Sequence, residues 1–463
     1  MNHVPALDIS LTPIKPALAA GTQEDFQLLI RLSAKTETEI ARTPIAVVLV
    51  IDRSSSMRGK RLQAAKDCCL DFVNRLHDQD QVGVVIYEDR IKVLLELMSA
   101  QEARACLAKK LDSFDVKGCT NLHGGWLMGA NTLLPLGKST NMCRVLLLSD
   151  GKVNRGLIDA DSICHEVALL ANQGVTTSTV GLGLNFNENL MTAMAISGYG
   201  TAMYGVTPED LVEPFEAEID LLSQLVWRDV KLKINSTLNT WKNHNDYIQC
   251  TENTWQMPAI AVNTEAWMAL TINMEELAKA VSHTENLSVL TVEISAKDCD
   301  GVEHEFMASL PLLPIVSADE YKQFPIDEMV EKRFAEIAVA DFQRQARLAI
   351  QRRDFAEVER LLQQLEECAE NNLWLKKNLE ELRQNWIKKD FMLMEKELAY
   401  SSYSMKNRLT KLNEDEYSDF ELDKPAYLRR KTSQGRRSDN LSKRAKNPSV
   451  QGGDVSGSIP NFS

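Results

Sequence analysis

The stretch VVLVIDRSSSM places oxygen-bearing side chains directly after an apolar run. Asp52 ends the run, and Ser54 and Ser56 follow at alternate positions of the turn. A buried strand gains nothing from a carboxylate at its tip, so Asp52 predicts a ligand there. Carboxylate and hydroxyl oxygens that converge on a tight loop suit Mg²⁺, with Mn²⁺ possible and Ca²⁺ less favoured.

Two further oxygen donors occur later in the chain. Thr120 lies in KGCTNLHGG just before a helical pattern, and Asp150 follows the apolar run RVLLLS. If the strands before Asp52 and Asp150 are neighbours in one sheet, their carboxylates lie close together and repel. A divalent cation removes that repulsion, and the five residues together predict a metal site.

The elements around these residues predict an α/β fold for residues 44–226. Apolar runs such as IAVVLVI and QVGVVIY alternate there with amphipathic helical patterns. Such alternation is typical of a doubly wound, mostly parallel sheet that helices cover on both faces. The run IKVLLEL follows a short turn, so we expect it to pair antiparallel at one edge. The carboxyl ends of the parallel strands form the ligand crevice of such a sheet.

The flanking segments show strand periodicity instead. Residues 1–43 and 227–316 alternate apolar and polar side chains without a long helical pattern, which indicates antiparallel strands. We therefore expect segment 1–43 to pair with segment 227–316. The α/β domain would then be inserted into an antiparallel β-sandwich.

The C-terminal part divides into a helical segment and a tail. In residues 317–400, Asp354 is placed to cap a helix that begins at Phe355, which predicts a helical hairpin. Residues 401–463 are poor in apolar side chains and predict a disordered tail. Its stretch 424–446 carries nine Lys and Arg side chains against Asp439 alone. We interpret this stretch either as solvated chain or as an arm that docks on acidic protein, on nucleic acid or on the chain's own acidic body.

Residues 44–226 resemble a von Willebrand factor type A (VWA) domain with its metal-ion-dependent adhesion site (MIDAS), and the wider layout is similar to multidomain bacterial members. The motif DxSxS, then Thr, then Asp is matched by the residues named above. The stretch TVGLGLNFNENLMTAMAISGYGTAMYGV also resembles the family's last strand, helix and small final strand. One departure is Ser55, where many members have glycine at a position that is not a ligand. The metal ligands that the resemblance implies are Asp52, Ser54, Ser56, Thr120 and Asp150.

The same resemblance implies a Rossmann-like fold and a protein-binding function. The hydroxyl groups ligate the ion directly or nearly so, and the aspartates act directly or through water. One coordination position stays open, and an acidic residue (Asp or Glu) of a partner protein fills it. Movement of the Thr120 loop relative to the DRSSS loop could switch affinity, as in some relatives.

The amino-acid composition restricts the class of protein, its ligands and its location in the cell. The 463 residues are 44% hydrophobic and 25% charged, as in a globular protein of several domains. The net charge of −13 argues against nucleic acid as the ligand of the folded part, except through the basic tail. We expect no membrane span and no leader segment. Nine cysteines without paired spacing favour a reduced, cytoplasmic protein.

Alternatives to a binding module have weaker support. Ser54 with His123 or His165 could suggest a nucleophile and its base, but no GxSxG elbow surrounds any serine. A metal-assisted hydrolase is conceivable because Mg²⁺ and carboxylates can activate water. A regulatory subunit or adaptor of an ATPase or signalling complex is the other alternative. We expect no catalytic residues and no enzymatic activity.

Overall fold

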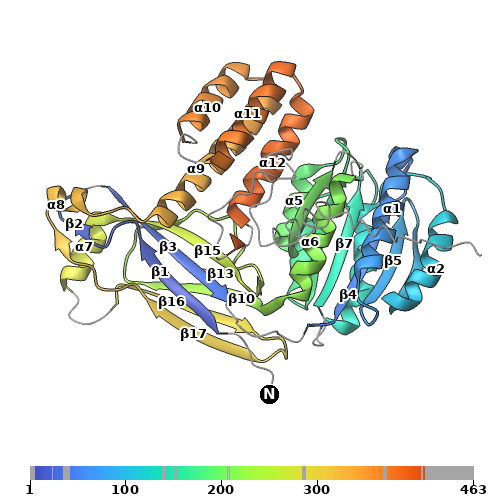
Figure 1. Cartoon of the computed structure of the whole chain (residues 1–463), viewed down its shortest axis with the longest axis horizontal. Coiled ribbons are helices and arrows are strands. Elements are labelled where there is room, and N and C mark those ends of the chain that lie inside the picture. The colour runs from blue at the N-terminus through green and yellow to red at the C-terminus, as the bar shows by residue number, and fades with distance from the viewer. Residues whose placement is uncertain are drawn as a thin grey trace, which may run out of the picture.

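The computed structural model of the chain shows three units. It describes residues 6–22, 24–34, 42–137, 142–150, 154–205, 207, 209–283, 288–368, 373–407 and 410–411. Figure 1 shows an α/β unit on the right, a β-rich unit on the left and a helical module above them. The predicted disordered tail, residues 401–463, is wrong at its start, because residues 401–407 continue helix α12 (Phe391–Asn407) and residues 410–411 form a short strand; residues 408–409 and 412–463 lie outside the described residues.

The α/β unit is built on one six-stranded sheet of order β6-β5-β4-β7-β8-β9. All neighbouring strands are parallel except β5 and β6, which are antiparallel. The predicted mostly parallel sheet and its antiparallel edge strand are therefore confirmed. The strands are β4 (Ile45–Asp52), β5 (Gln81–Tyr87), β6 (Ile91–Ser99), β7 (Met142–Ser149), β8 (Val175–Leu182) and β9 (Tyr199–Gly205).

Helices cover both faces of this sheet. Val47 and Leu49 of β4 pack into one hydrophobic core with α1, α2 and α6, whereas Val48 and Val50 pack into a second core with α3, α4 and α5. Successive side chains of a strand point to opposite faces, so a central strand between two helical layers is apolar throughout. The helices are α1 (Lys60–Arg75), α2 (Ala100–Asp112), α3 (Leu122–Leu133), α4 (Ala160–Ala171), α5 (Glu188–Ser197) and α6 (Val212–Ser223).

The β-rich unit joins segments from both sides of the α/β unit. Its first sheet has the order β1-β3-β15-β11, and β3 pairs antiparallel with β15 over ten residues. Its second sheet has the order β12-β13-β10-β16-β17, and one apolar core contains residues of both sheets. The strands that carry this unit are β1 (Leu7–Pro13), β3 (Asp25–Ala34), β10 (Leu225–Ser236), β11 (Trp241–Asn243), β12 (Gln249–Thr251), β13 (Thr254–Gln256), β15 (Thr264–Asn273), β16 (Leu290–Lys297) and β17 (Glu303–Ser309).

Shorter elements complete the β-rich unit. Strand β2 pairs parallel with β18, β14 pairs with β10, and β19 pairs with β15. These elements are β2 (Leu18–Ala19), β14 (Ile260–Ala261), β18 (Ile315–Val316), β19 (Thr410–Lys411), α7 (Met274–His283) and α8 (Ala318–Gln323).

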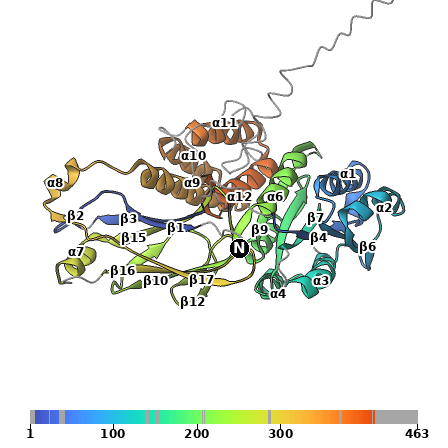
Figure 2. The ribbon, with the colours of Figure 1, turned by 60° about the horizontal axis from the view of Figure 1, so that its bottom comes forward.

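The helical module consists of α9 (Glu328–Gln351), α10 (Phe355–Cys368), α11 (Leu373–Lys388) and α12 (Phe391–Asn407). A separate apolar core holds these helices together. The predicted cap is confirmed, because Asp354 Oδ1 accepts a hydrogen bond of 3.2 Å from the Glu357 amide at the start of α10. Figures 1 and 2 both show α12 between the rest of this module and the α/β unit. In the described part of the chain, no helix is both long and apolar enough to cross a membrane.

Candidate functional site

Asp52 is the last residue of β4 and is fully buried. Its Oδ1 accepts a hydrogen bond of 2.8 Å from the Ser54 amide, which turns the chain sharply after the strand. Its Oδ2 accepts a bond of 2.9 Å from the hydroxyl of Ser149, the last residue of the neighbouring strand β7. The two strand ends are thus joined directly at the carboxyl edge of the sheet.

Ser54, Ser56 and Asp150 complete a cluster beside Asp52. The hydroxyls of Ser54 and Ser56 are 2.9 Å apart, and Ser56 donates a bond of 2.8 Å to Asp150 Oδ1. Arg61, in the first turn of α1, donates to Asp150 Oδ2 at 3.0 Å and to the Ser56 carbonyl at 3.1 Å. Four of the five predicted site residues therefore lie in one hydrogen-bonded cluster of oxygen atoms.

Thr120 lies on a loop that is fixed against the serine turn. The Ser55 amide and hydroxyl both donate to the Gly118 carbonyl, at 3.1 and 3.0 Å. The Thr120 amide donates to Asn154 Oδ1 at 2.8 Å, and the Thr120 side chain is buried. Within the described residues, no hydrogen bond links the Thr120 hydroxyl to the other four site residues. The structure thus places Thr120 on the loop that is bonded to the serine turn.

Gly118 makes this loop possible. Its φ is +67°, and a Cβ at this position would lie 2.3 Å from Glu88 Oε2 and 2.7 Å from Asp89 Oδ2. Only glycine adopts this backbone conformation without strain and fits this close approach. Glu88 is itself held by Arg53, whose Nη2 donates to it at 2.8 Å.

The electrostatics of the cluster favour a cation. Burial raises the pKa of Asp52 to about 6; hydrogen bonds from Ser54 and Ser149 lower it, and the charge of Asp150 raises it. Burial also raises the pKa of Asp150, although the Ser56 hydroxyl and the Arg61 charge act in the opposite direction. Two desolvated carboxylates in one crevice repel each other, and a nearby positive charge stabilises both.

Sequence reasoning missed two residues of the site, Ser149 and Arg61. A polar residue at the end of an otherwise apolar run was a usable signal for Ser149. No sequence pattern singles out Arg61, because helix first turns commonly carry exposed basic side chains. His123, considered as a base for Ser54, instead lies 2.9 Å from Glu166 through Nε2 and packs beside Trp126.

The loop after β8 connects the site to the helical module. A Cβ at Gly183 would lie 3.5 Å from Arg61 Nε, so this loop is next to the arginine that contacts Asp150. Three residues further on, the Phe186 carbonyl accepts a bond of 2.6 Å from Lys396 on α12. Glu188, at the start of α5, is paired with Lys396 and with Arg347 of α9. The loop after β8 therefore lies beside Arg61 and is bonded to α12.

The von Willebrand factor type A domain model matches residues 46–216, the region that contains the whole crevice. This region forms a von Willebrand factor type A domain. The structure of a von Willebrand factor type A protein from Catenulispora acidiphila aligns with 81% of this chain and 90% of that chain, at a TM-score of 0.62 and 18% identity. The structure of the ArnB paralog VWA2 from Sulfolobus acidocaldarius aligns with 86% of this chain and 98% of that chain, at a TM-score of 0.57 and 18% identity. Both structural alignments extend beyond the VWA domain, and they show similarity of fold only.

Curated relatives are similar over a shorter part of the chain. The uncharacterized protein YfbK of Escherichia coli is 30% identical over 190 residues, 41% of this chain and 33% of that protein. The uncharacterized protein sll0103 of Synechocystis is 27% identical over 220 residues, 47% and 51% of the two chains. Human inter-alpha-trypsin inhibitor heavy chain H1 is 26% identical over 208 residues, which are 43% of this chain and 23% of that protein. The chain thus spans about half or less of the length of these relatives.

The donor set of the VWA crevice fits a hard divalent cation. Its oxygen donors are the carboxylates of Asp52 and Asp150 and the hydroxyls of Ser54 and Ser56, with Thr120 on the next loop. The described residues contain no group of three or more His, Cys, Asp or Glu side chains placed to hold a metal. A site in this chain would therefore depend on hydroxyl ligands, which suit Mg²⁺ or Mn²⁺ better than zinc.

Proposed function

We propose that the chain is a metal-dependent protein-binding module. Mg²⁺ or Mn²⁺ binds at the VWA crevice through Asp52, Ser54, Ser56, Thr120 and Asp150, and an Asp or Glu of a partner protein completes its coordination. The observation that carries the proposal is the convergence of the Ser54 and Ser56 hydroxyls on Asp150, beside the buried Asp52 carboxylate.

The chemistry of the crevice favours capture over turnover. Hydroxyl ligands are neutral and leave the cation electron-poor, so an incoming carboxylate binds well. His123 is paired with Glu166, and the described residues show no hydrogen bond between His123 and Ser54. We therefore propose binding without catalysis. The eight cysteines whose side chains the structure describes are all free, which supports a reducing, cytoplasmic location.

Metal titration tests the first half of the proposal. Calorimetry of the full chain with MnCl₂ is expected to show one site. The variant Ser54→Ala/Ser56→Ala is expected to lose at least about ten-fold in affinity, equivalent to about 1.4 kcal/mol. Ser55→Ala is the matched control, because the Ser55 hydroxyl donates to the Gly118 carbonyl and not to the cluster. Equal affinity of both variants and the wild-type chain would overturn the metal site.

Partner capture tests the second half. The immobilised full chain is exposed to a lysate in Mg²⁺ or in EDTA, and the recovered proteins are compared with those held by Ser54→Ala/Ser56→Ala. We expect partners that appear only on the wild-type chain in Mg²⁺. Recovery of the same partners in EDTA would show that binding uses another surface.

A further inference from the structure

Two turns of the helical module share one sequence pattern. The turn between α9 and α10 reads RRDF at residues 352–355, and the turn between α11 and α12 reads KKDF at residues 388–391. In both turns the Asp amide donates to the carbonyl five residues back, at 2.9 and 3.0 Å, and the Asp carboxylate accepts a backbone N–H of the next helix at 3.2 Å. The module therefore builds the same turn twice, at its upper end in Figure 1.

The second cation of each turn has a backbone conformation that favours glycine. Arg353 and Lys389 have φ angles of +59° and +57°. A side chain at such a φ costs conformational strain that glycine avoids, and glycine is the commonest residue at this position after a helix. Both turns thus keep a positive side chain where the backbone favours glycine, and retained strain of this kind points to a role outside folding.

Apolar side chains of the two turns meet at the same end of the module. The Phe355 and Phe391 rings are stacked with centroids 5.1 Å apart, and Trp386 lies within 6 Å of both. Phe355, Ile387 and Met392 are 43%, 76% and 53% exposed. We call this set the tip surface: Phe355, Trp386, Ile387, Phe391 and Met392.

Positive side chains adjoin the tip surface. Four exposed cations lie on the same two turns: Arg352, Arg353, Lys388 and Lys389. Within the described residues, no ion pair joins these four cations to a carboxylate. The carboxylates of Asp354 and Asp390 are held by the backbone N–H groups that they cap. The tip surface is therefore apolar with a positive rim, in a chain whose net charge is −13.

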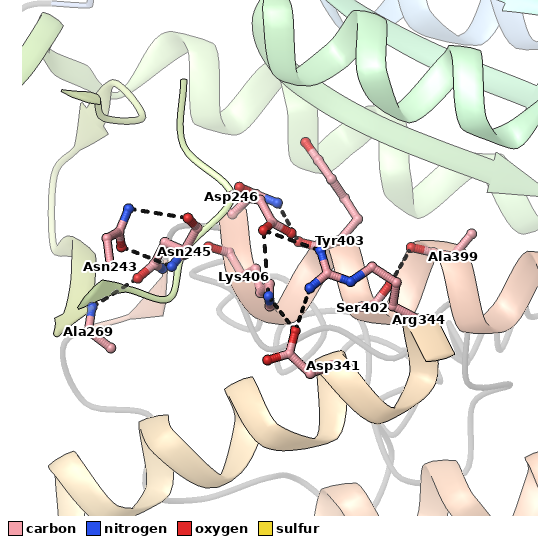
Figure 3. Close-up of polar contacts among 11 residues, drawn as sticks. Asn243, Asn245, Asp246, Ala269, Asp341, Arg344, Ala399, Ser402, Tyr403 and Lys406 are labelled. Atoms are coloured by element: carbon pink, nitrogen blue, oxygen red, sulfur yellow. Dashed lines mark hydrogen bonds and ion pairs between the residues drawn. The ribbon is translucent and has the colours of Figure 1, made fainter. Parts of the chain in front are cut away.

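The tip surface lies at the outer end of a module whose base is fixed. Lys406, near the end of α12, is paired with Asp341 of α9 at 2.7 Å, and its carbonyl accepts a bond of 2.9 Å from Asn245 of the β-rich unit. Figure 3 shows this base, with Lys406 between Asp246 and Asp341. The 17 residues of α12 place the tip about 25 Å from the base, and Figure 1 shows it projecting beyond the other two units. A flat partner can therefore contact the tip without meeting the rest of the chain.

Charge and shape together favour an anionic lipid bilayer as that partner. A second copy of the chain that used the same surface would set four cations against four cations. Exposed apolar side chains on a projecting end can enter the lipid headgroup region, where tryptophan and other aromatic rings are favoured. Each nearby Lys or Arg adds attraction to anionic lipids. Contact of this kind requires no helix that crosses the bilayer.

We propose that the tip surface docks the chain on an anionic lipid bilayer. Ile387 and Met392 enter the headgroup region, and the four cations lie among the lipid phosphates. This proposal does not depend on the metal site.

Cosedimentation of the full chain with lipid vesicles tests the docking. The vesicles contain either equal parts of phosphatidylglycerol and phosphatidylcholine or phosphatidylcholine alone, and we expect binding to the anionic vesicles only. Arg353→Gly/Lys389→Gly is expected to weaken this binding about ten-fold, because two cations are removed. The same variant is expected to unfold in urea at an equal or higher concentration than the wild-type chain, since glycine relieves the strain of the positive φ. Ile387→Ser/Met392→Ser is expected to weaken vesicle binding about ten-fold as well.

Two control variants remove similar side chains away from the tip. Lys109→Gln/Lys242→Gln removes two exposed cations, and Met307→Ser removes an apolar side chain of β17 that is 71% exposed. Both controls are expected to stay within about two-fold of the wild-type chain. Equal losses in the controls and the tip variants would overturn the proposal, because the effect would then be one of net charge or general stickiness. Tip variants that bind like the wild-type chain would assign vesicle binding to another part, such as the basic stretch 424–446, and would also overturn it.

Trp386 reports directly on the position of the tip. Anionic vesicles whose lipid chains carry bromine quench the fluorescence of tryptophan that enters the bilayer, and we expect Trp386→Phe to remove most of this quenching. Quenching that the substitution leaves unchanged would overturn the proposal. Soluble poly-L-glutamate tests the competing class of partner. If it binds through Arg353 and Lys389 while anionic vesicles do not bind, the surface belongs to an acidic protein and the proposal is wrong.

Discussion

Ser56 and Asp150 are 94 residues apart in the chain, yet the Ser56 hydroxyl donates a hydrogen bond of 2.8 Å to the Asp150 carboxylate. The contact exists because β4 and β7 are parallel neighbours whose carboxyl ends meet at one edge of the sheet. Parallel topology therefore assembles the crevice from residues that no local sequence pattern connects.

Ser149→Ala removes the hydroxyl that donates a hydrogen bond of 2.9 Å to Asp52 Oδ2. We expect the free energy of unfolding to fall by about 1–2 kcal/mol, because a buried carboxylate loses a hydrogen bond. Urea unfolding measures the change. Ser113→Ala, whose exposed hydroxyl donates to the Lys110 carbonyl, is the control and is expected to change stability by less than about 0.5 kcal/mol. An equal effect of the two substitutions would contradict the importance of the Asp52 contact.

Arg61→Gln tests competition between a protein cation and a metal ion. Arg61 lies 3.0 Å from Asp150 and is partly exposed. Removing its charge is expected to raise Mn²⁺ affinity by roughly three-fold, a modest effect because solvent screens the arginine. Calorimetry with MnCl₂ measures it. Arg58→Gln is the control, because it removes an exposed charge just before α1, and within the described residues no ion pair joins Arg58 to Asp150. A drop in affinity for Arg61→Gln would show that the arginine orients Asp150 instead.

Gly118→Ala is expected to lower the free energy of unfolding by about 1–3 kcal/mol and to weaken Mn²⁺ binding, because the Thr120 loop must shift. Gly21→Ala is the matched control. Gly21 has a φ of +72° but nothing within 4 Å of the added Cβ, so only the backbone strain is shared. If Gly118→Ala costs no more stability than Gly21→Ala, the close approach to Glu88 has no structural role.

Glu188 predicts acid sensitivity of the contact between the VWA domain and the helical module. Burial acts to raise the pKa of Glu188, but its hydrogen bond and charge pairing with Lys396, and its bond with Arg347, bring it below the ordinary value of 4.5. A lowered pKa in the folded state means that this carboxylate stabilises the fold above its ordinary pKa. That stability is lost as the pH falls through the lower, folded-state value.

Urea unfolding from pH 6 to pH 3 measures this loss. Glu188→Gln is expected to be less stable than the wild-type chain at pH 6, since Lys396 and Arg347 lose their counter-charge. The difference between the two chains is expected to shrink below pH 4.5. A difference that stays constant with pH would mean that the charge of Glu188 does not stabilise the contact.

The sequence predicted the parts of the fold that hydrophobic periodicity indicates, and it predicted the site residues that lie at the ends of apolar strands. The unbroken apolar run of β4 indicated a central strand between two helical layers, and Asp52 and Asp150 marked the carboxyl edge of the sheet. The family match then supports the VWA domain itself. Apolar alternation also indicated antiparallel strands in residues 1–43 and 227–316, although it could not give their register.

The contacts between the units could not be predicted, because no residue pattern in the sequence marks them. Lys396 meets Glu188 across 208 residues, and each residue alone is an ordinary charge on a helix. Arg61 reaches Asp150 because of the rotamer and the helix position, and neither property is visible in a residue pattern. The order of the loops could be predicted, but the distance between the Thr120 hydroxyl and the serine cluster could not.

The central claim is that five oxygen donors surround one divalent cation at the crevice. Anomalous diffraction from crystals grown in MnCl₂ tests it most directly. The account predicts a single strong peak about 2.0–2.2 Å from the Ser54 and Ser56 hydroxyl oxygens, with Thr120 and the two aspartates around it. A crevice without a peak, with the Arg61 side chain still paired to Asp150 at saturating Mn²⁺, would contradict it.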